Sequence, residues 1–80
     1  MDPTHDLFVD LNSLDETGLP WSFIDQANDP ARIAVGAFVV VGAGSVRAVA
    51  QVVDITKGGI VHVHPLSGPV SEHSHLLQPR

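Results

Sequence analysis

The chain has 80 residues, no cysteine, and nine acidic against four basic residues, which gives a formal net charge of −5 at pH 7. A chain of this length has room for one hydrophobic core, and without cysteine neither disulfides nor thiolate metal sites can stabilise it. Seven of the nine acids lie in residues 1–30, where there is no Lys or Arg, and the four bases are scattered over residues 31–80. Such a distribution makes a nucleic-acid partner unlikely, because affinity for phosphates needs clustered bases.

The N-terminal sequence has no basic n-region and no apolar run of signal-peptide length, and glycines interrupt the longest apolar stretch. We therefore expect a soluble, cytoplasmic protein that does not engage a membrane. Composition divides the chain into an acidic N-terminal arm (1–14), a single β-rich domain (15–70) and a flexible tail (71–80). The arm is interpreted as a solvated segment, with a docking arm for a basic partner as the alternative.

The first candidate element covers residues 7–11, which could form a short strand or remain a loose arm. The next signal is a Pro at position 20, followed by Trp21, Ile24 and Ala27 at helical spacing and a stop at residues 28–30. This pattern predicts a short helix or 3₁₀ turn over residues 20–27. Trp21 is interpreted as a cap on one end of the core, and stacking on a ligand is the alternative.

Residues 36–42 form the strongest predicted strand, a β-branched run bounded by glycines, and residues 43–45 turn it. Residues 46–55 are ambiguous, because their valines fit a helical stripe while their β-branched density fits a strand. We choose the strand. Residues 56–59 predict a hairpin turn, and residues 60–64 alternate apolar with polar until Pro65 ends them. A turn over residues 66–69 then leads to a last short strand near Val70.

These elements predict a mainly β fold, either an SH3-like small barrel or a bent antiparallel sheet of four to five strands with one short helix near residues 20–27. Antiparallel pairing is favoured because the connections at 42–45 and 56–59 are too short for parallel crossovers.

One motif needs separate treatment. Gly42 and Gly44 follow a strand, and a helix after them would resemble the start of a dinucleotide-binding unit. Arg47 occupies the third glycine position of that motif, however, and the chain is too short for the fold that carries it. The glycines are therefore interpreted as turn residues.

The histidines suggest the only candidate metal ligands. His62 and His64 leave the same face of one strand, and His73 and His75 repeat that spacing in the tail. Zinc accepts imidazole ligands, so His62 and His64 are weak metal candidates, but structural zinc sites usually include cysteine. We interpret them instead as solvent-facing strand residues whose neighbours Val61 and Val63 face the core. A pH-sensing role is a further alternative.

Catalytic groupings are missing. There is no Cys or Tyr, Lys57 lies in a Gly-flanked turn, and the serines have no nucleophile-elbow context. Asp15 and Glu16 are adjacent and point apart on any regular element. We therefore expect no enzyme, no catalytic residue and no cofactor.

Six stretches between residues 12 and 70 carry a family resemblance: Asp15-Glu16-Thr17-Gly18-Leu19-Pro20-Trp21-Ser22-Phe23-Ile24-Asp25, Asp29-Pro30, Val35-Gly36-Ala37, Val52-Val53-Asp54-Ile55, Val61-His62-Val63 and Leu66-Ser67-Gly68. Together they resemble small uncharacterised actinobacterial proteins. The resemblance implies a compact β fold with a short Trp-bearing helix, and it implies no activity, cofactor or catalytic residue. The tail departs from the charged helical ending that is commoner in that family.

The function that fits best is a non-catalytic interaction module that binds a protein or peptide through an exposed strand edge or a groove beside Trp21. The predicted surface consists of Leu19, Trp21, Phe23 and Arg47. Two alternatives remain, a small-ligand or zinc site at the histidines and nucleic-acid binding by a small barrel. We expect a monomer or a weak homodimer.

Overall fold

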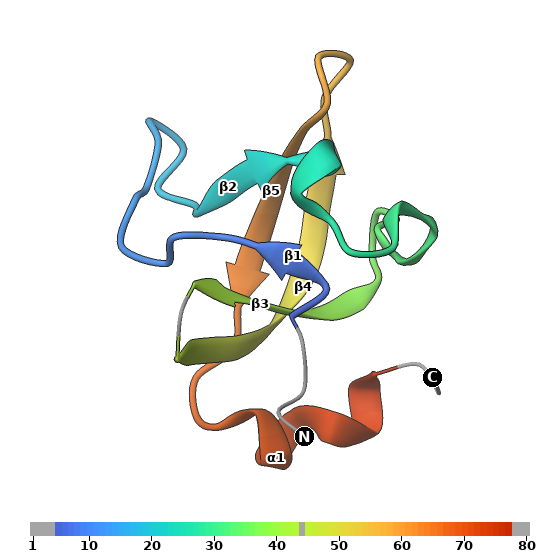
Figure 1. Cartoon of the computed structure of the whole chain (residues 1–80). Helices are drawn as coiled ribbons and strands as arrows, with labels where there is room; N and C mark the ends of the chain where they lie inside the picture. The colour runs from blue at the N-terminus through green and yellow to red at the C-terminus, as the bar shows by residue number, and fades with distance from the viewer. Residues whose placement is uncertain (1–4, 44, 78–80) are drawn as a thin grey trace.

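The computed structural model describes residues 5–43 and 45–77, which fold into one curled, mixed β-sheet (Figure 1). Its strands lie in the order β1-β3-β4-β5-β2, and the sheet nearly closes into a barrel. The strands are β1 (Leu7–Phe8), β2 (Trp21–Phe23), β3 (Phe38–Ala43), β4 (Val46–Ile55) and β5 (Ile60–Pro65); the helices are α1 (Val70–His73) and the 3₁₀ turns η1 (Ile24–Gln26), η2 (Pro30–Arg32) and η3 (Ser74–Leu76). The mainly β class predicted from the sequence is confirmed.

Strands β3, β4 and β5 form an antiparallel meander that is the largest part of the sheet. β4 pairs with β3 from Phe38 opposite Gln51 to Ala43 opposite Val46, and it pairs with β5 along its other edge. Because β4 satisfies its backbone on both sides, the ambiguous residues 46–55 are a strand, as predicted. A dinucleotide-binding unit would need a helix after its glycines, and residues 46–55 form a strand instead.

Gly42 is required where β3 turns into β4. Its φ is +156°, and a Cβ built on it would lie 1.9 Å from the carbonyl oxygen of Val46. No side chain fits into that space, so the glycine serves the close approach of two backbones.

The N-terminal segment closes the sheet from the other side. β1 pairs in parallel with β3, with Leu7 opposite Val41, so the expectation of a wholly antiparallel sheet is wrong at this pair. The buried carboxylate of Asp6 accepts a hydrogen bond from the amide of Val40 at 2.9 Å, which secures β1 to β3. An isolated bridge between Leu7 and Ala27 then brings β1 beside the segment that follows β2.

The core consists of aliphatic side chains on the inner face of the curled sheet. Val61 and Val63 are fully buried, as the alternation along β5 predicted. Trp21 is half-buried and does not belong to the core cluster, so it does not cap the core as expected. The cluster comprises Leu7, Val9, Ile33, Val39, Val41, Ala50, Val52, Val61 and Val63.

Two predicted elements differ in the structure. A short helix or 3₁₀ turn was expected over residues 20–27. The 3₁₀ turn forms but covers only Ile24–Gln26, because Trp21–Phe23 are extended and pair with β5. The short last strand expected near Val70 is the helix α1, which begins after Pro69 and packs against β4 (Figure 1). Pro suits the position before a first helical turn, because it cannot donate the hydrogen bond that a strand would need.

Across the described residues, every helix is too short to cross a lipid bilayer.

Candidate functional site

An open groove of about 370 Å³ lies over the place where β1 and β2 approach each other. β1 contributes one residue, the loop after it two, β2 three and η1 one. We call this feature the seam groove; it is lined by Phe8, Asp10, Ser13, Trp21, Ser22, Phe23 and Gln26. It combines aromatic walls with hydrogen-bonding groups, which is the composition of a binding surface.

Two aromatic rings from β2 form one corner of the seam groove. Trp21 lies opposite His62 and Phe23 opposite Ile60 in the β2–β5 ladder, while the residue between them, Ser22, is buried. The two-residue period of a strand therefore places both rings on the outer face. Their centroids are 5.4 Å apart and their planes meet at 85°. Phe23 is 47% exposed, a large value for a ring in so small a domain.

The backbone of β2 also faces the seam groove. The amide of Val63 donates to the carbonyl of Pro20, and the amide of Ile24 donates to the carbonyl of Gly59. In an antiparallel ladder, hydrogen-bonded and non-hydrogen-bonded positions alternate, so Trp21 and Phe23 occupy non-hydrogen-bonded positions. Their N–H and C=O groups are directed away from β5, toward β1. The edge of β2 thus offers main-chain groups beside the aromatic corner.

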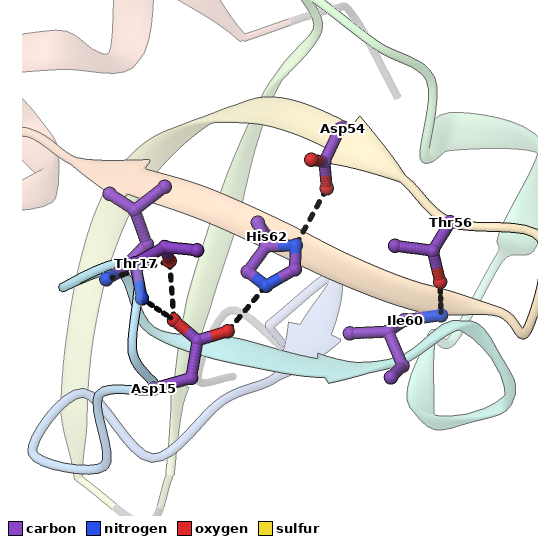
Figure 2. Close-up of polar contacts among 7 residues, drawn as sticks. Asp15, Thr17, Asp54, Thr56, Ile60 and His62 are labelled. Atoms are coloured by element: carbon purple, nitrogen blue, oxygen red, sulfur yellow. Dashed lines mark hydrogen bonds and ion pairs between the residues drawn. The ribbon is translucent and has the colours of Figure 1, made fainter.

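His62, the partner of Trp21 across the ladder, lies between two carboxylates (Figure 2). Its Nδ1 is 2.6 Å from Oδ1 of Asp54, and its Nε2 is 2.6 Å from Oδ2 of Asp15. The imidazole is 11% exposed, the side chain of Asp15 25% and that of Asp54 55%. The expectation of a solvent-facing His62 is therefore wrong, whereas His64 is exposed as expected.

A β-bulge puts Asp54 in this position. Val52 pairs with Val63, but the next pair is Asp54 with His62, so Val53 is the extra residue of β4. In a regular ladder Val53 would lie opposite His62. Because of the bulge, the carboxylate of Asp54 takes that place instead.

A tight turn brings Asp15 to the other side of the imidazole (Figure 2). The amide of Gly18 donates to the carbonyl of Asp15, and the φ of +79° at Gly18 is one that glycine adopts without strain. Oδ1 of Asp15 accepts from the amide of Thr17 at 2.8 Å and from the Thr17 hydroxyl, which leaves Oδ2 for His62. The turn thus presents a fully oriented carboxylate.

This geometry shifts the pKa values of His62 and Asp15. The hydrogen bonds to Asp15 and then to Asp54 raise the pKa of His62 above its ordinary 6.5, although burial opposes them. The hydrogen bond from the Thr17 hydroxyl, with a further contribution from His62, lowers the pKa of Asp15 to about 2. An imidazolium that donates to both carboxylates satisfies all three groups. Both ring nitrogens of His62 are therefore engaged by carboxylates.

The described residues contain no group of three or more His, Cys, Asp or Glu side chains arranged to hold a metal ion. His64 lies opposite Gln51 on the β4–β5 ladder, apart from the carboxylates that hold His62. Nε2 of His73, the last residue of α1, donates to the carbonyl oxygen of Ser67 at 2.6 Å.

The four residues predicted from the sequence as a partner surface do not come together. Trp21 and Phe23 share the seam groove, but Leu19 and Arg47 are not among its lining residues. Leu19 belongs to the turn that presents Asp15, where its amide donates to the Thr17 hydroxyl. Arg47 lies opposite Gly42, at the other end of β4 from Asp54.

Sequence reasoning missed Phe8, Asp10, Ser13, Ser22 and Gln26 at the seam groove, and it missed the Asp15–His62–Asp54 cluster. Phe8 and Asp10 had a usable signal, since both alternate with the buried Leu7 and Val9 and so had to face outward. The cluster had none, because it depends on a bulge and on a turn 47 residues away from His62.

No protein-family model, curated protein or solved structure matches this chain. The resemblance of residues 12–70 to small actinobacterial proteins stays a prediction.

Proposed function

We propose that this protein is a non-catalytic interaction module that binds an extended segment of a partner protein in the seam groove. The observation that carries the proposal is the coincidence, at one edge of β2, of the half-buried ring of Trp21 and the exposed ring of Phe23 with main-chain groups directed toward the same seam. Main-chain groups give affinity for an extended segment, and the side-chain corner gives selectivity.

The Asp15–His62–Asp54 cluster supports this function rather than a catalytic one. A general base needs a free ring nitrogen within reach of a proton to abstract. In this cluster both nitrogens of His62 contact carboxylates, so the imidazole joins the 15–18 turn to β4 and β5 instead. Asp15 lies in the chain between Ser13 and β2, and His62 pairs with Trp21 in the β2–β5 ladder, so the cluster ties the segment that lines the seam groove to β4 and β5.

A peptide selection tests the proposal. A random dodecamer library displayed on phage is panned against the wild-type protein, and the enriched peptides are titrated into ¹⁵N-labelled protein. We expect peptides that shift the amides of Phe8, Trp21 and Phe23 and that lose at least about tenfold in affinity for Trp21→Ala.

Val35→Ala is the matched control, because Val35 is an exposed apolar residue outside the seam groove. It should bind the peptides as the wild type does, and thermal unfolding should show that both variants remain folded. Enrichment of no peptide, or of peptides that shift only residues outside the seam groove, would contradict the proposal.

A further inference from the structure

We propose, building on the function above, that the seam groove recognises an arginine side chain of the partner segment. The first argument is the shape of its aromatic walls. The planes of Trp21 and Phe23 are nearly perpendicular at 85°, and Phe8 lines the groove from β1. Between perpendicular rings, a cation can lie on the negative face of one ring while the second ring contacts the cation from the side. Trp and Phe faces attract guanidinium groups in this way, arginine more often than lysine.

The second argument is the polar lining. The seam groove contains one carboxylate, Asp10, together with the side-chain amide of Gln26 and the hydroxyl of Ser13, and none of its lining residues carries a positive charge. Oδ1 of Asp10 accepts from the amide of Asn12 at 3.0 Å, which orients the carboxylate at the rim. A neutral apolar side chain would leave these acceptors unused, whereas a guanidinium has five N–H groups to donate.

The third argument is the charge around the groove. The N-terminal half of the molecule, which supplies every lining residue, carries most of the acids, among them the exposed Asp25 next to Gln26 in η1. The net charge of −5 adds a long-range attraction for basic segments. Charge and aromatic geometry thus select the same class of ligand.

The hydrogen-bonding groups distinguish arginine from other cations. A quaternary ammonium would satisfy the rings alone, and it offers no donor to Asp10 or Gln26. A planar guanidinium stacks on a ring with its face and donates with its edge. The seam groove has both partners for it.

Three capped pentapeptides test this inference. The first has a central arginine flanked on each side by one valine and one threonine. The second has citrulline in place of the arginine, and the third has lysine. Citrulline has nearly the shape of arginine without its charge. Trp21 is the only tryptophan of the chain, so its fluorescence reports the titration directly. We expect the arginine peptide to bind about tenfold more tightly than the citrulline peptide and several-fold more tightly than the lysine peptide.

Two variants locate the recognition. Asp10→Asn keeps an acceptor for the Asn12 amide but removes the charge, and it should reduce the preference for arginine over citrulline to about threefold or less. Glu16→Gln removes the same charge from an exposed residue that is outside the groove, and it should leave the preference unchanged.

Equal affinity for arginine and citrulline would overturn the inference and leave the proposed function standing. A lysine peptide that binds as well as the arginine peptide would overturn the guanidinium assignment, and equal losses in both variants would replace the site by a diffuse charge effect. If none of the three peptides binds at millimolar concentration, the inference also fails, while the library selection decides the proposed function separately.

Discussion

Asp54, and not Val53, lies opposite His62, because one extra residue is inserted into β4 between Val52 and Asp54. This single shift of register gives the imidazole its second carboxylate. On the other side, Asp15 reaches the same ring from a turn that is 47 residues distant in sequence. The result joins three separate parts of the chain, namely the 15–18 turn, β4 and β5, through one imidazole ring.

The first prediction concerns the contribution of His62 to stability. In His62→Ala the carboxylates of Asp15 and Asp54 lose the cation between them, and we expect the free energy of unfolding to fall by about 1–3 kcal/mol. The matched control is His64→Ala, since His64 lies on the same strand and is exposed; it should change the value by less than about 0.5 kcal/mol. Urea unfolding followed by Trp21 fluorescence gives both numbers, and equal effects would contradict the structural role assigned to His62.

The second prediction concerns pH. Because the pKa of His62 is raised in the folded protein above its ordinary 6.5, the folded state binds the proton more tightly than the unfolded chain does. The stabilisation is fully present below about pH 6.5 and is lost as the pH rises through the folded pKa. Urea unfolding between pH 5.5 and 8.5 should therefore show a decreasing free energy of unfolding, with a shallower decrease in His62→Ala. A wild-type profile as shallow as that of the variant would refute the raised pKa.

The third prediction concerns the anchor of β1. Oδ2 of Asp6 is the acceptor for the buried amide of Val40, so Asp6→Ala leaves that amide without this partner. We expect a loss of about 1–3 kcal/mol, and a smaller loss for Asp6→Asn, which retains an oxygen acceptor. Asp25→Ala, at an exposed position in η1, serves as the control. If Asp6→Ala unfolds at the same urea concentration as the control, β1 does not depend on this contact.

The fourth prediction concerns Gly42. A methyl group at this position would overlap the carbonyl of Val46, so Gly42→Ala must displace one backbone of the β3–β4 hairpin. We expect a loss of at least about 2 kcal/mol. Gly58→Ala is the comparison, because its Cβ would come no closer than 4.0 Å to Thr56 Oγ1; it should shift stability by less than about 1 kcal/mol. Similar melting temperatures for the two variants would mean that the hairpin relaxes easily.

The meander from β3 to β5 was predictable because its signals are local. The valine run of residues 39–41, the glycines at 58 and 59, and the alternation around His62 each act within a few residues. Residues 20–27 show the limit of such signals, since their helical spacing is real but the ladder with β5 keeps Trp21–Phe23 extended. Pairing with a distant strand outweighs a weak local preference.

The sequence by itself determined the β class, the antiparallel meander and the buried side of β5, because short-range patterns of β-branched and turn-forming residues decide them. Only the tertiary structure decided the parallel pairing of β1, the bulge at Val53, the Asp15–His62–Asp54 cluster and the seam groove. Each of these depends on contacts between segments that are far apart in the chain, and the closure of the sheet, not any local pattern, brings those segments together.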